Sequence, residues 1–347
     1  MSVIADPVFG MSPPSITIEQ AEALARDHFG VIGRATRLSS ERDANFRIET
    51  GDGPRLLKIG NPAEPPAVTN LQTRILLHLA NAAPTVPVPR LIADMDGRFE
   101  VVCAFGQEAT HVVRMMSFLP GTALAEGMDR RRHPIAIVQL LAALDAALAS
   151  LSAEGADHPL LWDGSRPLQV RPLLPTISDA GDRAQVEALL DRWEAVIAPR
   201  LSGLRRQLIH NDFNPCNILI HGERVTGIID FGDALEAPLV NDLATAAAYL
   251  LDDDADPVDT LVELLGAYHA LLPLEPEEAG LLLELVRSRW AITVAISNWR
   301  AARYPDNRNY ILRNGPGARR WLHRTAGLDM VAVETRLRAV VSEGGTA

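Results

Sequence analysis

The spacing of apolar residues along the chain predicts short strands first and helices afterwards. The first predicted helix runs from Ile16 to about Phe29, and Thr17 is placed to act as its N-cap. Two strand-like runs follow, at 45–50 and 55–60, with a glycine-rich turn between them. This arrangement predicts a β-hairpin.

A second helix and three further strands are predicted before the pattern changes. The helix, at 67–80, carries apolar residues along one face: Leu71, Ile75, Leu76 and Leu79. The runs 91–93 and 99–105 predict a second hairpin, and 111–118 a further strand. After the breaker at 119–121 the spacing is helical for most of the remaining chain.

This change of pattern predicts an α+β fold of two lobes, a strand-rich N-lobe and a mostly helical C-lobe. A chain of 347 residues is long enough to bury a core in each. We expect these parts in order: a flexible leader at 1–15, the N-lobe at 16–116, a hinge at 117–121, the C-lobe at 122–341 and a flexible tail at 342–347.

Composition narrows the class of protein. The net charge is −11 and no basic stripe occurs, which argues against nucleic acid as a partner. The most apolar segment, 134–152, contains Gln139 and Asp145, so we expect a buried helix there and no membrane partner. The two cysteines lie far apart without metal-ligand spacing, and no signal peptide is evident. We expect a cytoplasmic protein, and the oligomeric state stays open.

The candidate chemistry lies in the C-lobe, between three short strand-like runs. Asp212 is followed five positions later by Asn217, and Asp230 comes after a further hydrophobic strand. Phosphoryl transfer needs a carboxylate to accept the hydroxyl proton, here Asp212, and oxygen ligands for Mg²⁺, here Asn217 and Asp230. The alternative is that both aspartates are turn residues and that Asn217 caps a strand end.

Lys58 is the single lysine in a chain whose lysines and arginines total 33. It lies on the second strand of the first predicted hairpin. A lone lysine suggests a site where the wide arginine fork does not fit and a compact ammonium is needed. The alternative is a solvated lysine left by chance, and the phosphate-handling motif in the C-lobe favours the first interpretation.

In these motifs the chain resembles the aminoglycoside phosphotransferase and choline kinase superfamily, which has a protein-kinase-like fold. Within it, the chain is most similar to the hydroxylysine kinase-like branch, and the resemblance covers about 35 to 325. The matching segments are a polar loop (38–46), a hinge (114–121), two catalytic segments (212–214 and 230–233) and a C-terminal signature (297–300, 304–307 and 310–312).

The resemblance implies a role for each matching position. Lys58 would hold the α- and β-phosphates, and backbone groups of Ser117 and Leu119 would meet the purine. The polar loop at 39–45 contains no glycine, so Ser39, Ser40 and backbone amides would have to bind phosphate.

Two further positions depart from the superfamily. Gln72 stands where a glutamate usually pairs with the lysine, and its neutral amide can bond an ammonium without neutralising it; Glu64 or Asn70 could substitute. Asn211 occupies a position that is mostly glycine. We expect His210 to brace the catalytic loop through backbone hydrogen bonds.

Candidates for acceptor binding are less specific. Asp233 and Glu236 could face a substrate ammonium, although a structural role is about equally supported. Asn214 follows the base closely, and Arg300 could meet a substrate carboxylate, although packing is the default interpretation. Asp242 is most simply an N-cap.

Taken together, the sequence predicts a Mg²⁺-dependent kinase that transfers the γ-phosphoryl group of ATP or GTP to the hydroxyl of an amino acid or amino alcohol, such as 5-hydroxylysine. Homoserine, choline, ethanolamine and aminoglycosides are alternative acceptors. A nucleotide-binding pseudokinase without turnover is the alternative of another class, and Gln72 is its main support.

Overall fold

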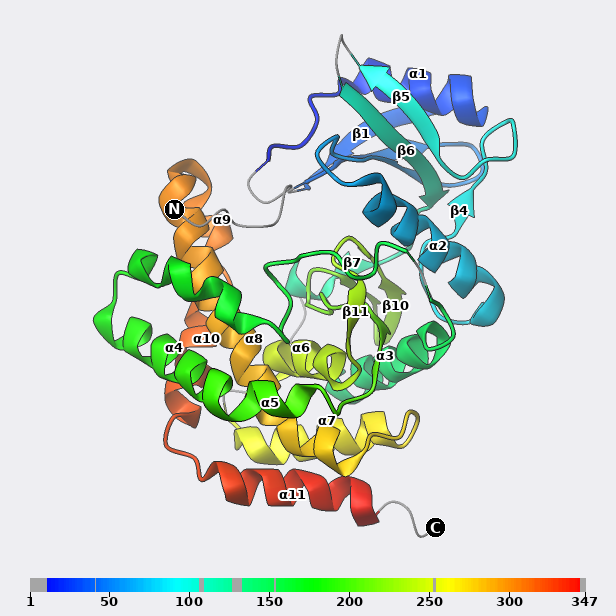
Figure 1. Cartoon of the computed structure of the whole chain (residues 1–347). Coiled ribbons are helices and arrows are strands. Elements are labelled where there is room, and N and C mark those ends of the chain that lie inside the picture. The colour runs from blue at the N-terminus through cyan, green and yellow to red at the C-terminus, as the bar shows by residue number, and fades with distance from the viewer. Residues whose placement is uncertain are drawn as a thin grey trace.

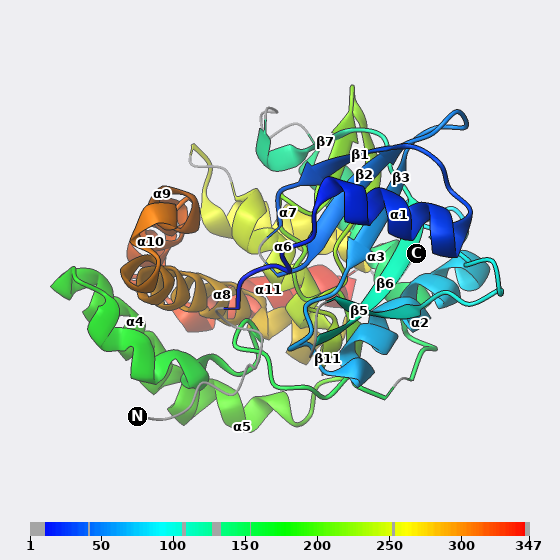
Figure 2. The same ribbon diagram turned by 90° about the horizontal axis from the view of Figure 1, so that it is seen from above.

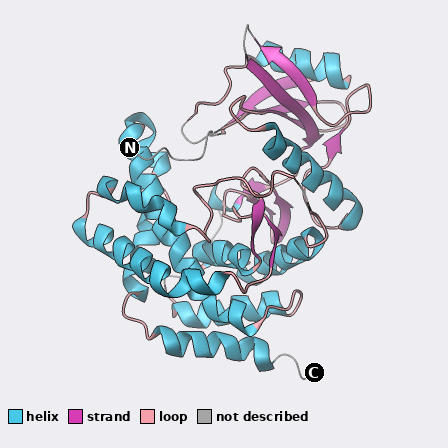
Figure 3. Ribbon diagram, viewed as in Figure 1, coloured by secondary structure: helices cyan, strands magenta, loops and turns pink. Residues whose placement is uncertain are grey.

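The chain forms two lobes, with a sheet-containing N-lobe above a larger helical C-lobe (Figures 1 and 3). The computed structural model describes residues 11–40, 42–105, 109–126, 133–152, 154–251 and 254–343. Within these ranges the predicted α+β organisation is confirmed. The last long strand of the N-lobe ends at Ser117, and the first C-lobe strand begins at Thr122, on either side of the segment proposed as the hinge.

The N-lobe sheet is antiparallel in the order β1-β2-β3-β6-β4, with β5 also paired to β6. Its strands are β1 (Arg34–Leu38), β2 (Ala44–Glu49), β3 (Arg55–Ile59), β4 (Leu91–Ile92), β5 (Val101–Phe105) and β6 (Ala109–Ser117). The predicted hairpin is β2–β3, and it places Lys58 opposite Asn45 on one side and Arg114 on the other. Helix α1 (Ile18–Phe29) begins at a capping box formed by Thr17 and Gln20, as the sequence predicted for its N-cap.

The second predicted hairpin is wrong. Strands β4 and β5 pair with β6, Leu91 opposite Met116 and Val101 opposite Val113. Between them the Asp94 carboxylate accepts backbone N–H groups of Asp96 and Arg98 and holds a tight turn. Strand β1, which lies beside β2, was not predicted, because its alternation of side chains is largely polar.

The apolar residues form two main cores. The smaller one lies between α1 and the N-lobe sheet, and Figure 2 shows α1 crossing over the strands. The larger one fills the C-lobe. Helix α2 (Pro66–Ala82) comes before the hinge, yet its apolar face, with Leu71, Ile75 and Leu79, joins the larger core. The helix therefore links the two lobes through packing as well as through the chain.

The C-lobe is built around one long helix, α8 (Pro276–Arg303). Every residue from 278 to 297 is buried, because α6, α10 and α11 pack around it. The other helices are α3 (Pro134–Leu148), α4 (Ala180–Arg192), α5 (Ala198–Leu201), α6 (Val240–Leu250), α7 (Pro257–His269), α9 (Arg308–Ile311), α10 (Gly315–Thr325) and α11 (Met330–Glu343). Helical segments of 3₁₀ or π type lie at Leu124–Glu126, Pro167–Thr176, Trp193–Ile197 and Pro305–Asn307.

Two small sheets sit at the top of the C-lobe, facing the N-lobe (Figure 1). Their strands are β7 (Thr122–Ala123), β8 (Arg206–Ile209), β9 (Ile218–His221), β10 (Arg224–Ile228) and β11 (Leu235–Pro238). One sheet has the order β10-β9-β7, and the other pairs β11 with β8. The loops that leave β8 and β10 carry the predicted catalytic residues.

The predicted flexible ends need correction where the structure describes them. Asn61 donates a side-chain hydrogen bond to the Ser12 carbonyl at 3.0 Å, and Arg37 donates one to Pro14 at 3.1 Å. Helix α11 continues to Glu343, two residues into the predicted tail. Residues 1–10 and 344–347 lie outside the described ranges.

The apolar segment that begins at Pro134 forms α3, whose buried residues belong to the C-lobe core. Across the described ranges, no helix combines the length and the apolar character that a membrane span requires.

Candidate active site

The loop between β8 and β9 is anchored from below by a buried carboxylate. Asp242 accepts the backbone N–H groups of His210 and Asn211, each at 2.8 Å, through its two oxygens. The prediction of an N-cap at Asp242 is therefore wrong: α6 begins at Val240, and the carboxylate serves the catalytic loop instead. His210 has the predicted bracing role. Its ring contacts the Ile229 carbonyl at 3.1 Å and accepts the Asp212 N–H at 3.3 Å.

Two residues of the site hold a backbone conformation that few side chains tolerate. Asn211 has φ 61° and Asp230 has φ 65°. Asparagine and aspartate are enriched in this left-handed region because their short polar side chains bond the local backbone. This geometry gives a physical reason for an asparagine at position 211.

Asn217 is joined to the predicted base. Its Nδ2 donates to the Asp212 carbonyl at 3.0 Å and to Asp212 Oδ2 at 2.9 Å. The amide nitrogen is thus turned toward Asp212, and the amide oxygen is the atom that could act as a metal ligand. The predicted spacing of five residues allows this closed loop.

Lys58 reaches from β3 toward the C-lobe. Its ammonium lies 2.9 Å from Asp43 Oδ2 and 3.5 Å from Asp230 Oδ1. Burial opposes its charge, but Asp43 and Asp230 outweigh this effect and raise the pKa of Lys58. In return the charge of Lys58, helped by Arg42, lowers the pKa of Asp230 to about 2.

The acidic partner of Lys58 was predicted wrongly. Gln72 accepts a hydrogen bond from Arg114 Nη2 at 2.8 Å, and Asp43 provides the carboxylate instead. Asp43 comes directly before β2, and Asn45 pairs with Lys58 across the hairpin, so the sheet register brings the carboxylate to the ammonium. The weakness that Gln72 suggested in the lysine site is therefore absent from the described structure.

The polar loop before β2 also contacts the C-lobe. Arg42 forms an ion pair with Asp233, Nη1 to Oδ1 2.7 Å. Ser40, predicted to bind phosphate, accepts the Asp43 N–H through its hydroxyl at 3.3 Å. Glu64, considered as a partner of Lys58, lies close to this group of charges, and burial raises its pKa to about 7. Ser39 belongs to the same loop, beside Ser40.

The hinge is held against the segment before β4. The Ser117 N–H donates to the Arg90 carbonyl at 2.8 Å, and the Ser117 hydroxyl accepts the Arg90 N–H at 2.9 Å. The Ser117 N–H and hydroxyl groups are therefore already hydrogen-bonded within the protein. A nucleotide base would therefore meet the backbone carbonyl of Ser117 and groups of Leu119.

The remaining acceptor candidates are spread out. Asp233 lies in the site, close enough to raise the pKa of Asp212 by its charge. Asn214 accepts the Cys216 N–H at 2.7 Å. Glu236 is exposed on β11, with Arg206 at 3.8 Å, so the structure does not join it to the catalytic loop. Arg300 is in the last turn of α8.

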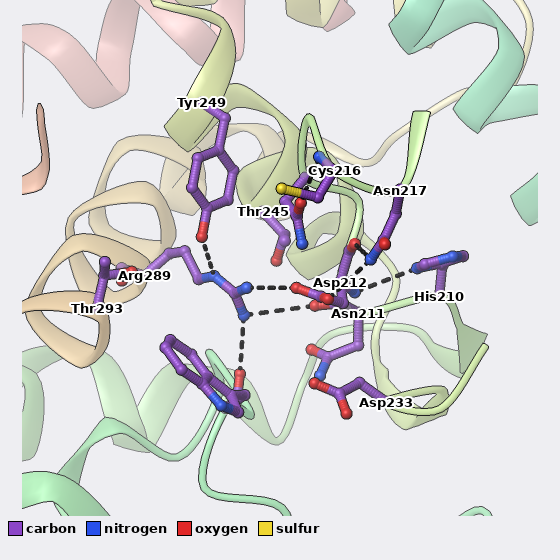
Figure 4. A network of polar contacts seen from close by, with 12 residues as sticks. His210, Asn211, Asp212, Cys216, Asn217, Asp233, Thr245, Tyr249, Arg289 and Thr293 are labelled. Atoms are coloured by element: carbon purple, nitrogen blue, oxygen red, sulfur yellow. Dashed lines mark hydrogen bonds and ion pairs between the residues drawn. The ribbon is translucent and has the colours of Figure 1, made fainter. Parts of the chain in front are cut away.

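The sequence interpretation missed a residue that contacts the base directly, Arg289 of α8. Its Nη2 lies 2.7 Å from Asp212 Oδ1 (Figure 4). Burial raises the pKa of Asp212 to about 6, the positive charge of Arg289 opposes this rise, and Asp233 adds to it. The sequence signal for this contact was the position of Arg289 within a strongly apolar helix. A buried arginine needs a carboxylate partner, but the sequence does not show which carboxylate that is.

Comparisons with known proteins identify the family of the chain. Residues 34–274 match the model of the phosphotransferase enzyme family. The chain belongs to this family. Its predicted phosphotransferase chemistry is confirmed with it.

Individual relatives extend the likeness over almost the whole chain. The hydroxylysine kinase of Mus musculus is 27% identical over 351 residues, which cover 92% of each chain. The homoserine kinase of Mesorhizobium japonicum is 29% identical and covers 71% of this chain and 73% of its own. These likenesses include hydroxylysine kinases, the branch that the sequence resembles.

The fold is similar to solved structures of small-molecule kinases. A microcompartment-associated aminopropanol kinase has a TM-score of 0.70 at 18% identity, covering 90% of this chain and 98% of its own. A spectinomycin phosphotransferase in complex with ADP and its antibiotic has a TM-score of 0.57 at 13% identity, covering 93% and 98%. The predicted kinase-like fold is therefore confirmed.

Proposed function

We propose that this chain is a small-molecule kinase that transfers the γ-phosphoryl group of ATP to a hydroxyl of an amino acid or amino alcohol. The observation that carries the proposal is the meeting of Lys58 from the N-lobe with Asp230 from the C-lobe, beside the loop that holds Asp212 and Asn217. These are the groups that phosphoryl transfer needs: Lys58 contacts Asp230, and Asn217 donates a hydrogen bond to Asp212.

The nucleotide would lie between the lobes. Lys58 is placed to bind the α- and β-phosphates, with Ser39, Ser40 and the loop amides around them. The hinge backbone at Ser117 and Leu119 would meet the base. ATP is the first candidate because solved relatives hold AMP-PNP or ADP, and GTP is the alternative.

The residues present fit a nucleotide-bound Mg²⁺. Asn217 and Asp230 supply the amide and carboxylate oxygens that this ion prefers. No cluster of three or more histidine, cysteine or acidic side chains that could hold a metal occurs among the described residues. This agrees with an ion that keeps waters and phosphate oxygens as most of its ligands. When bound, Mg²⁺ would offset charge on the phosphates.

Asp212 would act as the base for the acceptor. As the acceptor oxygen forms its bond to the γ-phosphorus, the bond from that phosphorus to the β–γ bridging oxygen breaks. The hydroxyl proton passes to Asp212, and ADP leaves with the bridging oxygen. Asn217 keeps the base in place, and Lys58 offsets negative charge on the phosphates.

An acceptor with an ammonium group fits this site. The relatives are named for hydroxylysine, homoserine and aminopropanol, which all carry an amino group and a hydroxyl. Asp233, near the base and paired with Arg42, is the carboxylate that we propose to meet such an ammonium. We rank 5-hydroxylysine first, with homoserine, ethanolamine, choline and aminoglycosides as alternatives. Substitution of Asn214, Glu236 or Arg300, followed by measurement of the acceptor KM, tests the substrate roles suggested for these residues.

An acceptor panel tests the proposal. Purified protein with Mg²⁺ and ATP or GTP is incubated with 5-hydroxylysine, homoserine, 1-amino-2-propanol, ethanolamine, choline and an aminoglycoside, and ADP or GDP release is followed with each. The expected result is acceptor-dependent release with at least one amino alcohol or hydroxy-amino acid, and none from Asp212→Ala. Tight nucleotide binding with no transfer to any acceptor would instead identify a pseudokinase.

We further propose a cytoplasmic location. Both cysteines, Cys103 and Cys216, are free thiols in the structure, as suits a reducing compartment. Cell fractionation with an antibody to the chain checks this, and recovery in a secreted or membrane fraction would contradict it.

A further inference from the structure

Arg289 occupies an unusual place for a cation. Its side chain is 3% exposed, inside the buried stretch of α8. Burying a guanidinium is costly, and a buried ion pair is weak support for stability, since well-packed apolar residues often serve the fold as well. An apolar residue would serve the packing of α8 equally well at this position. The groups that the Arg289 guanidinium contacts therefore indicate its role.

Most of the guanidinium's hydrogen-bonding capacity is already used. Nε donates to Tyr249 Oη at 3.3 Å, and Nη1 donates to the carbonyls of Trp162 at 3.2 Å and Asn211 at 3.5 Å. Nη2 donates to Asp212 Oδ1 at 2.7 Å. Arginine has five N–H donors, and these contacts occupy four of them. Too little capacity remains for a two-point contact with a substrate carboxylate or a phosphate.

Aromatic rings fix the guanidinium in place. Its central carbon lies 5.0 Å from the centroid of the Trp162 ring and 5.7 Å from that of Tyr249. Figure 4 shows Arg289 directed from α8 at Asp212, with Tyr249 on one side. Cation–π contacts and the fixed fork leave the group little freedom. Asn217 holds the other oxygen of Asp212, so the carboxylate is held from both sides.

From this geometry we propose that Arg289 is the positioning residue for the catalytic base: it fixes the orientation of the Asp212 carboxylate and keeps a compensating charge beside it. The inference rests on the proposed function. Arg289 acts through Asp212 and not by contact with the acceptor or the nucleotide. Its loss is therefore expected to reduce kcat and to leave both KM values nearly unchanged.

The test compares three substitutions of Arg289 with a matched control. Arg289→Gln and Arg289→Ala remove the charge, and Arg289→Lys keeps it without the fork. The control is Arg287→Gln, which removes another buried arginine of α8; its partner Glu284 keeps Arg192 at 2.7 Å. Each protein is assayed for kcat and for the KM of nucleotide and acceptor, with thermal unfolding as the check of fold.

We expect kcat to fall about 100-fold in Arg289→Gln and about 10-fold in Arg289→Lys, within the range for misplacing a general base. Arg287→Gln is expected to stay within about twofold of wild type, because its ion pair lies outside the site. Millimolar guanidinium should raise the kcat of Arg289→Ala about 10-fold by refilling the space beside Asp212. Urea, which has a similar shape and no charge, should not raise the kcat of Arg289→Ala. Neither additive should activate the wild type.

Three results would overturn the inference: a kcat for Arg289→Gln within twofold of wild type, a raised acceptor KM with unchanged kcat, or a loss that neither lysine nor guanidinium restores. If the wild type transfers phosphate to no acceptor, the proposed function fails instead. The same comparison then uses the slow transfer to water as its kcat, and an equal rate in wild type and Arg289→Gln would reject the positioning role.

Discussion

Lys58 and Arg289 are two cations of this site, one from each lobe, and their surroundings differ in opposite ways. Lys58 lies on a strand, and its partner Asp43 is 15 residues away on the neighbouring segment. Arg289 lies in a buried helix, 77 residues beyond its partner Asp212. The first pair follows from one hairpin, whereas the second exists only after the C-lobe has packed.

The difference separates two kinds of task. Lys58 is shared between Asp43 and Asp230, and one of its partners, Asp230, has a half-exposed side chain. Such a cation is free to turn to phosphate when nucleotide binds. Arg289 is enclosed by rings and carbonyls and serves the protein alone. We therefore propose that Lys58 is presented to the substrate and that Arg289 holds the base in place.

The strongest way to test the C-lobe half is Asp212→Ala. We expect kcat to fall by about 10³-fold or more, because the variant lacks the carboxylate proposed to accept the acceptor proton, while nucleotide affinity changes little. Steady-state kinetics and nucleotide titration measure the two effects. Asp259→Ala, at an exposed position paired with Arg336, is the matched control and should keep full activity. Retained turnover in Asp212→Ala would remove it as the base.

The N-lobe half is tested by Lys58→Arg, which keeps the charge and changes its shape. We expect kcat/KM for nucleotide to fall about 100-fold, because the planar fork does not fit between Asp43 and Asp230 as the compact ammonium does. Kinetics with varied nucleotide measure this. Full activity in the variant would contradict the argument from the single lysine, and an unchanged melting temperature excludes misfolding.

A smaller effect decides which residue supports Lys58. Asp43→Asn should lower kcat/KM for nucleotide about 10-fold, because the ammonium loses its nearest carboxylate. Gln72→Ala, at the position that the sequence suggested as the partner of Lys58, should leave nucleotide kinetics within about threefold, since the Gln72 amide accepts a hydrogen bond from Arg114. The reverse ranking would restore Gln72 as the partner of Lys58.

The smallest expected effect is a change in stability, at a buried carboxyl group beneath the catalytic loop. Asp145 is buried near Asp242 and accepts the Tyr268 hydroxyl at 2.6 Å. Burial, followed by the charge of Asp242, raises the pKa of Asp145 well above its usual value. The folded state then holds a proton that the unfolded chain has lost, so this group makes the free energy of unfolding fall as pH rises above about 4.

Asp145→Asn replaces the carboxyl group with an amide that does not titrate, so the folded and unfolded states no longer differ in proton binding at this position. We expect the variant to gain stability over wild type with rising pH, by up to about 1.4 kcal/mol per pH unit until the pKa of the folded state is reached. Urea unfolding at several pH values measures this difference. Asp259→Asn, at an exposed site, should show no such trend. A constant difference between Asp145→Asn and wild type would mean that Asp145 is ionised in the folded protein.

Much of the fold could be predicted because it depends on local patterns. The helix capped by Thr17 and the β2–β3 hairpin were found from residues close in sequence. The second hairpin failed for the opposite reason. Strands β4 and β5 pair with β6, and side-chain alternation alone does not say which strand will be the neighbour.

The same limit applies to the site. Asp212, Asn217 and Asp230 could be named because one loop and one hairpin carry them at fixed spacing. Asp242 was misread as a helix cap, since the sequence cannot show that its carboxylate lies below the loop of His210 and receives its amides.

By itself the sequence determined the two-lobed family, the loop that carries Asp212 and Asn217, and the single lysine that we propose to bind phosphate, because short-range spacing and residue chemistry decide these features. Only the tertiary structure decided the partners: Asp43 and not Gln72 for Lys58, and Arg289 for Asp212. The physical reason is that a buried charge must be compensated by whatever the packing of distant elements brings within a few ångströms, and that distance is not written in any local pattern.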